Sequence, residues 1–105
     1  MVYRCRNDPQ WSMAYVSAGC LELTGYSAAQ LLGGGGLTYS SLIHPGDRRY
    51  VWSSVQRGLQ EVRSFSFGYR LLCADGSERA VEERGCGIYA DNGEVIGLEG
   101  VVMAR

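Results

Sequence analysis

The chain of 105 residues contains no lysine and only one histidine, His44. A phosphate-binding loop needs a Lys-Ser/Thr pair after its glycines, so the glycine run at residues 33–36 does not predict a phosphate site. The formal net charge of −1 provides no basic surface for nucleic acid. Apolar runs are too short for a membrane span, and the N-terminus lacks a signal peptide's apolar segment. These absences predict a cytoplasmic domain without a membrane segment of its own, even if its parent protein is anchored to a membrane.

The sequence also gives little support for a metal or catalytic site. The four cysteines, Cys5, Cys20, Cys73 and Cys86, include no C-x-x-C pair, whereas structural zinc sites usually take their ligands in close pairs. We therefore expect reduced thiols and no metal. The sequence places no nucleophile or carboxylate against His44, so we predict that this domain is not an enzyme.

Periodicity and turn signals predict an α+β domain, with an antiparallel sheet and helices gathered on one side. Ser17 and Ser27 are placed to cap two short helices, which Gly25 and the glycine run end. The predicted elements are strands at 2–6 and 11–16, helices at 17–23 and 28–32, a helical turn within 37–43, a longer helix after Pro45, and strands near 65–71, 78–89 and 95–103.

The longer helix and the strand after it have the clearest patterns. Apolar residues 4, 4 and 3 positions apart share one helical face: Val51, Val55, Leu59 and Val62. Asp47 is predicted in the first turn, where its charge suits the helix dipole. From Phe65 to Leu71 every second residue is apolar, which indicates a strand with one buried face.

Four motifs, in this order and spacing, resemble those of PAS domains of the bacterial sensory-box type with a C-terminal PAC motif. They are Leu23-Thr-Gly-Tyr-Ser27, Leu42-Ile-His-Pro-Gly-Asp-Arg48, Tyr69-Arg-Leu-Leu-Cys-Ala-Asp-Gly-Ser77 and Val81-Glu-Glu-Arg-Gly85. The likeness covers about residues 3–103, with the PAC motif at about 64–103. Residues 1–105 are then a single PAS domain, which we expect to be cut from a longer multidomain signalling protein.

The resemblance implies a PAS fold: a five-stranded antiparallel sheet in the order 2-1-5-4-3, with short helices and one longer helix on one face. It also implies a sensory or regulatory module of a bacterial signal-transduction protein, such as a two-component system. Its partners would be an output domain in the same chain, a histidine kinase or a diguanylate cyclase, and a second copy in a homodimer. Two functions stay open: a sensor with a small ligand between sheet and helices, and a ligand-free dimerisation or protein-interaction module.

The resemblance predicts no particular cofactor. Haem-binding relatives generally offer a histidine from the long helix, and residues 50–59 contain none. Photoactive flavin-binding relatives share a Gly-x-Asn-Cys-Arg-Phe-Leu-Gln motif and amide side chains on the sheet. Cys20 lacks those neighbours, and the amide positions align with Leu71, Val81 and Val102. Haem and photochemical flavin are therefore disfavoured, loosely held redox FAD stays open, and any ligand would be an unknown small molecule.

Strand parity predicts which side chains face the space between sheet and helices. The candidate cavity-lining residues are Val51, Val55, Leu59, Phe67, Tyr69, Leu71, Val81, Glu83, Leu98, Gly100 and Val102. They either fill a plain hydrophobic core or line a small, mostly apolar ligand cavity, where Gly85 and Gly100 would leave room. Glu83 would pair with Arg79 or Arg63, lie exposed at the cavity mouth, or bind a ligand's polar end.

The other parity predicts a dimer or relay face that includes Arg70, Ala80 and Glu82. Related sequences usually carry Trp where Ala80 stands, and they often finish the last strand with Asp-Ile-Thr where this chain reads Met103-Ala-Arg105. The small Ala80 puts the usual packing of that face in doubt. The different C-terminal end indicates either excision from a longer protein, which we favour, or an unusual coupling to the output domain. The sequence assigns His44 a structural role at the start of the long helix. It leaves the glycine run as either a plain loop or a flexible entrance to the cavity.

Overall fold

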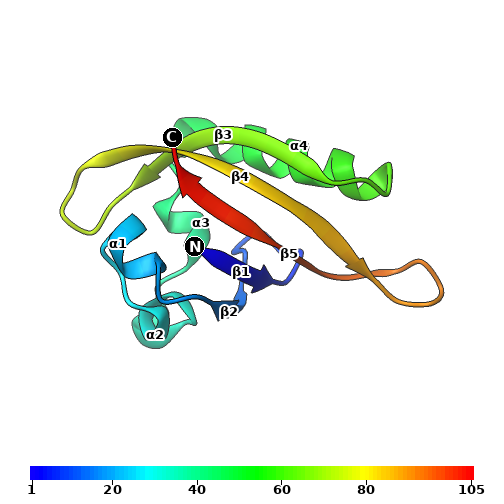
Figure 1. Cartoon of the computed structure of the whole chain (residues 1–105), viewed down its shortest axis with the longest axis horizontal. Helices are drawn as coiled ribbons and strands as arrows, with labels where there is room; N and C mark the ends of the chain where they lie inside the picture. Colours follow the sequence, from blue (N-terminus) through cyan, green and yellow to red (C-terminus); the bar gives the residue numbers. More distant parts are fainter.

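The computed structural model describes residues 1–33 and 35–105. Over these residues the chain forms one antiparallel sheet of five strands in the order β2-β1-β5-β4-β3, the order that the resemblance implied. The strands are β1 (Val2–Cys5), β2 (Met13–Val16), β3 (Phe65–Leu72), β4 (Glu78–Tyr89) and β5 (Val95–Ala104). Figure 1 shows the helices behind or beside this sheet, and the β4–β5 hairpin projecting beyond them at one end.

The helical elements connect β2 to β3. They are α1 (Cys20–Thr24), α2 (Ala28–Leu31), the 3-10 turn η1 (Gly34–Gly36), α3 (Tyr39–Leu42), the 3-10 turn η2 (Pro45–Asp47) and α4 (Arg48–Gln60). In Figure 1, α1 and α2 gather near β1 and β2, while α4 runs along β3 on the far side of the sheet. Within the described part of the chain, no helix is long and apolar enough to cross a membrane.

The ends of the short helices follow local chemistry, with two predictions confirmed and one wrong. Ser27 forms a capping box with Gln30: its hydroxyl accepts from the Gln30 backbone N–H, and the Gln30 side-chain Oε1 accepts from the Ser27 N–H. Gly25, with a φ of 82°, ends α1 as predicted. Ser17 does not cap that helix. It lies three residues before α1, and its hydroxyl accepts from the Val2 N–H at 2.8 Å, which ties the end of β2 to β1.

The long helix α4 is shorter than predicted at both ends. Val51 and Val55 are buried as expected, but the helix ends at Gln60, and Val62 has a φ of 51° and is 70% exposed. Asp47 lies just before α4. Its carboxylate accepts from the Arg70 guanidinium at 2.9 and 3.0 Å and from the Arg70 N–H at 2.9 Å. This ion pair, rather than the helix dipole alone, accounts for Asp47 and joins the start of α4 to β3.

The register of the sheet agrees with the predicted parity. Phe67 pairs with Glu83 and Tyr69 with Val81, so their side chains share the inner face of β3 and β4. The prediction for residue 11 was wrong: β2 begins at Met13, and Trp11 has a φ of 52° in the preceding loop. This backbone turns the Trp11 ring inward, where it is buried with its centroid 5.3 Å from that of Trp52 on α4.

Candidate functional site

A polar network occupies the centre of the inner sheet face. Glu83 on β4 is only 6% exposed. Its Oε2 accepts from the Tyr3 hydroxyl of β1 at 2.5 Å, and its Oε1 accepts from the Tyr69 hydroxyl of β3 at 2.7 Å. The Tyr39 hydroxyl of α3 lies 2.7 Å from that of Tyr69. The network therefore joins four elements: β1 and β3 bond the carboxyl group on β4 directly, and α3 is linked to it through Tyr69.

The directions of these hydrogen bonds follow from the number of protons available. Each tyrosine hydroxyl has one proton to donate. Because Tyr69 donates to Glu83, Tyr39 is the donor to Tyr69. Both carboxylate oxygens of Glu83 thus accept, as an ionised carboxylate does. Among the described residues, every buried side-chain nitrogen and oxygen has a hydrogen-bond partner, so the network is satisfied.

Burial controls the ionisation of this network. Desolvation raises the pKa of Glu83 above its ordinary value, and the bonds from Tyr3 and Tyr69 oppose that rise. Desolvation and the nearby Glu83 carboxyl also raise the pKa values of Tyr3, Tyr39 and Tyr69. The pKa of the buried Cys5 thiol rises to about 12 for the same two reasons. Burial therefore disfavours the charged form of every group in this cluster.

Of the three alternatives for Glu83, pairing with Arg79 or Arg63 was wrong. Arg63 pairs with Glu61 instead, and the Arg79 guanidinium donates to the Glu22 carbonyl oxygen at 3.2 Å. Within the described residues, no arginine forms a salt bridge with Glu83. Among the described residues, the tyrosine hydroxyls are the groups that hold this carboxyl. The alternative of an exposed position at a cavity mouth was also wrong, because Glu83 is buried.

A small internal cavity lies against Glu83. The centre of a water molecule can occupy a volume of about 10 Å³ in this cavity. That is roughly the smallest volume that holds one water. Apart from Glu83, its wall combines aromatic, aliphatic and sulfur-containing side chains: Tyr3, Cys5, Trp11, Met13, Tyr39, Ile43, Val51, Val55 and Leu98. The cavity is thus almost filled by the protein's own side chains in this conformation.

The eleven predicted lining residues lie at the cavity, in the core around it, or half-buried beside Tyr3. Four of them line this cavity: Val51, Val55, Glu83 and Leu98. Six others are buried in the surrounding core: Leu59, Phe67, Tyr69, Leu71, Val81 and Val102. The last, Gly100, is half-buried, and a Cβ there would lie 2.9 Å from the Tyr3 hydroxyl oxygen. At Gly85 the same distance is 2.8 Å, so Tyr3 takes the space that the two glycines leave.

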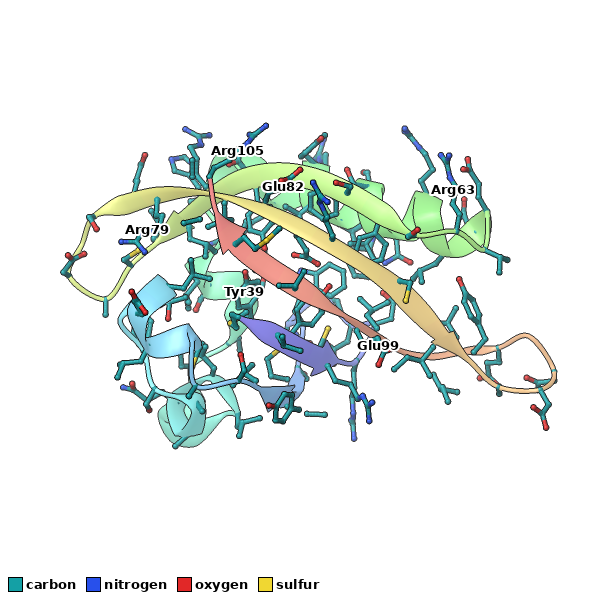
Figure 2. All side chains as sticks on the ribbon, in the orientation of Figure 1. Tyr39, Arg63, Arg79, Glu82, Glu99 and Arg105 are labelled. Atoms are coloured by element: carbon teal, nitrogen blue, oxygen red, sulfur yellow. The ribbon has the colours of Figure 1, made fainter. Side chains whose placement is uncertain are left out.

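Sequence reasoning missed the aromatic side of the cavity. Tyr3 and Cys5 alternate with Val2 and Arg4, so strand parity alone would have placed them on the inner face. Tyr39, labelled in Figure 2, lies on α3 and forms a hydrogen bond with Tyr69, which is 30 residues later in the sequence. No local pattern predicts that pairing.

A surface groove adjoins the internal cavity. Trp11, Met13 and Tyr39 line both, so these three side chains separate the cavity from the outside. The groove has a volume of about 270 Å³ and runs between the start of β2 and the segment that follows α2. Gly33 and Gly36, with φ of 103° and 82°, lie on its rim. Gly33 ends α2 as predicted, while Gly34 lies outside the described residues.

The predicted dimer or relay face is the opposite side of the sheet. Arg70 and Ala80 are exposed there, but the Arg70 guanidinium is already bound by Asp47. Glu82, labelled in Figure 2, is half-buried and lies 3.6 Å from the Arg84 guanidinium. The Ala80 carbonyl oxygen accepts from the Arg105 N–H at 3.0 Å. The Arg105 guanidinium lies over Gly68, so small residues leave room for an arginine on this face.

His44 has the structural role that the sequence assigned. Its Nδ1 accepts from the Gly46 N–H at 3.0 Å, which caps η2, and its Nε2 lies 3.4 Å from Glu78. Across the described residues, no three His, Cys, Asp or Glu side chains gather as a metal site would require.

Comparison with known proteins identifies the family. Residues 13–102 match the sequence model of the PAS fold, so this chain belongs to the PAS family. A sensor from Methanosarcina acetivorans, the methyl sulfide methyltransferase-associated sensor, is 32% identical over 104 residues. That match covers 98% of this chain but 10% of the relative, so the chain spans about a tenth of the length of that protein.

Solved structures share the fold. A sensory box histidine kinase/response regulator from Burkholderia thailandensis has a TM-score of 0.75 at 22% identity, over 98% of this chain and 74% of that one. The N-terminal domain of a diguanylate cyclase with PAS/PAC sensor from Marinobacter aquaeolei has a TM-score of 0.77 at 18% identity, over 98% and 92%. Light-oxygen-voltage domains, including one studied with a flavin analogue, also have this fold. The chain thus has the PAS fold, which also occurs in these signalling proteins.

Proposed function

We propose that this single domain is the sensory module of a cytoplasmic signal-transduction protein and binds a small ligand at the inner sheet face. The observation that supports this most directly is the buried Glu83–tyrosine network beside a cavity. A carboxyl group without a cationic partner is costly inside a core, whereas it is useful where a ligand must be recognised. Histidine kinases and diguanylate cyclases, in which PAS relatives occur, are the output domains that we propose.

The network offers a route from ligand to output. It joins β1, β3, β4 and α3, so a ligand that changed one of its hydrogen bonds would shift the balance between two arrangements of sheet and helices. On β4 the residue beside Glu83 is Glu82, which faces the other side of the sheet and pairs with Met103 of β5. Movement of β4 would therefore change the outer sheet face. We propose that this face contacts a partner or the output domain.

The same geometry disfavours haem and photochemical flavin as that ligand. Leu71, Val81 and Val102, which align with the flavin-binding amide positions of relatives, are fully buried apolar residues. The free volume beside Glu83 corresponds to about one water, so a haem or a flavin ring system would have to displace much of the core. A ligand of few atoms requires the least rearrangement.

Natively purified protein tests the proposal. Absorption spectroscopy and native mass spectrometry would reveal a retained ligand, and a thermal-shift screen over small cations, anions and neutral compounds would reveal one that exchanges. We expect at least one class to raise the melting temperature, because a ligand that binds only the folded state stabilises it. A colourless protein without bound mass that no class stabilises would overturn ligand sensing.

The ligand-free dimerisation module is the alternative, and exposed apolar residues on the outer sheet face favour it. Val2, Tyr15 and Met103 are 52%, 54% and 39% exposed on β1, β2 and β5. A homodimer through this face would be weakened by Met103→Glu or Glu82→Arg in sedimentation velocity. Arg70 is a poor probe of the dimer, because its substitution would also break the ion pair with Asp47. Self-association unchanged by both substitutions would contradict this alternative.

A further inference from the structure

Glu83 retains acceptor capacity on the side of the cavity. A carboxylate has about four lone-pair sites. Tyr3 occupies a site on Oε2 and Tyr69 a site on Oε1, which leaves about one site on each oxygen. Because Glu83 itself lines the cavity, a donor placed there reaches the carboxyl group. An additional hydrogen-bond donor, rather than another acceptor, is what this group can take.

The rest of the cavity wall favours positive charge. Tyr3, Trp11 and Tyr39 contribute aromatic rings, whose faces attract cations. No lysine or arginine lies among the lining residues in the described part of the chain, so an anion would meet Glu83 without a compensating charge. A neutral molecule would leave the carboxylate uncompensated in a buried site.

We propose that the ligand of this cavity is a small primary alkylammonium ion, with its nitrogen on Glu83 and its alkyl group toward Trp11 and Met13. The proposal rests on the ligand-binding function proposed above and names the chemical class of that ligand. An ammonium head has three donors, enough for both Glu83 oxygens and the Tyr39 hydroxyl oxygen.

The size of the site limits the alkyl group. The free volume holds about one water, so an ammonium head fits and a short alkyl chain needs Met13 to move toward the adjoining groove. Methionine has three rotatable bonds and adapts readily to such a change. Methylammonium and ethylammonium are therefore the probes of choice.

Binding of a cation is linked to the ionisation of Glu83. Burial raises the pKa of Glu83, and a bound cation favours its ionised form, so binding displaces the proton wherever the ligand-free carboxyl carries one. The other titratable groups around it are Tyr3, Cys5, Tyr39 and Tyr69, whose pKa values are all raised and which stay neutral over the working range. Affinity should therefore rise with pH through the pKa of Glu83.

Tryptophan fluorescence provides the test, because Trp11 lies on the cavity wall. The chain has two tryptophans, so a Trp52→Phe background leaves Trp11 as the reporter. This protein is titrated with methylammonium and ethylammonium chloride, and in parallel with ethanol and sodium acetate, at constant ionic strength. We expect saturable binding of the two cations, with an affinity that rises with pH, and no saturable response to ethanol or acetate.

Two variants locate the site. Glu83→Gln should weaken alkylammonium binding by about tenfold or more, since it removes a charge-assisted hydrogen bond. Glu94→Gln, at an exposed position in the turn between β4 and β5, should bind as the parent does. If Glu83→Gln fails to fold, the comparison of ethylammonium with ethanol on the parent protein decides the question.

The outcomes separate the two proposals. Ethanol or acetate binding as tightly as ethylammonium would overturn the ammonium ligand and leave ligand sensing intact. Equal affinity of Glu83→Gln and the parent for ethylammonium would also overturn it. Failure of all four probes, together with a thermal-shift screen in which no compound binds, would overturn both.

Discussion

Removing the Tyr3 hydroxyl should destabilise this domain by an amount that depends on pH. Tyr3→Phe deletes the donor to Glu83 Oε2 and leaves the ring in place between Gly85 and Gly100. A hydrogen bond to a charged group contributes about 1.5–3 kcal/mol, and one between neutral groups about 1 kcal/mol. For a domain of this size 1 kcal/mol shifts the melting temperature by about 4–8 °C.

The pH dependence follows from the ionisation of Glu83. The folded-state pKa of Glu83 is raised above 4.5, and the bond from Tyr3 lowers it. Tyr3→Phe therefore raises that pKa further. Well below pH 4.5 the carboxyl is protonated in every state, and the substitution costs about 1 kcal/mol. As pH rises through the two folded-state values, the variant loses more stability than the parent, and the cost grows toward about 3 kcal/mol.

Urea denaturation between pH 4 and pH 9 measures this cost directly, with the slope m checked for constancy. Tyr15→Phe is the matched control, because Tyr15 is 54% exposed on β2 and its side chain does not contact Glu83. That control should change the free energy of unfolding by less than about 0.5 kcal/mol at any pH. A cost for Tyr3→Phe that is the same at both ends of the range would refute an ionisable Glu83 held by this hydroxyl.

Two further substitutions test other parts of the fold. The Arg70 guanidinium lowers the pKa of Asp47 from 3.8 to about 2. Asp47→Asn should cost about 1 kcal/mol near pH 6, after allowance for solvent screening, and the difference from the parent should vanish as pH falls through 3.8 toward 2. A difference that persists at pH 2 would contradict this. Gly100→Ala should cost about 2–3 kcal/mol by urea denaturation, because its Cβ would lie 2.8 Å from the Gly85 Cα and closer still to the Arg84 carbonyl oxygen. Gly19→Ala, whose Cβ meets nothing nearer than 3.8 Å, is its control, and equal costs would exclude close packing at Gly100.

The parts of the fold that repeat a local period were predictable from the sequence. Phe67 and Tyr69 alternate with Gly68 and Arg70, and a two-faced strand is the structure that buries such a pattern. The turn at 75–76 then sets the register with β4, which is why the inward direction of Glu83 was predicted correctly. The order of the five strands was predicted instead from the resemblance to the family, since no local pattern specifies it.

The errors lie where the backbone leaves a regular element. Trp11 and Val62 both have positive φ, a conformation that bulky and β-branched residues seldom adopt and that periodicity does not register. Each was assigned to the neighbouring element on the strength of its apolar side chain. The partners of Glu83 were missed for another reason: opposite charge suggested arginine, whereas the fold brings Tyr3 and Tyr69 to the carboxyl group over 80 and 14 residues.

The cost of burying Glu83 bears on the choice between a plain core and a ligand site. Apolar residues of similar volume would fill the centre of the sheet at least as stably as a buried carboxyl and its phenols. Yet Tyr3 and Tyr69 donate to one carboxylate oxygen each, and Glu83 keeps further acceptor capacity. The cavity that Glu83 lines is also lined by Trp11 and Met13. A network built only for packing would have its acceptors turned toward protein donors on every side. An acceptor facing a cavity whose wall continues into a surface groove is better explained by a donor that arrives from outside.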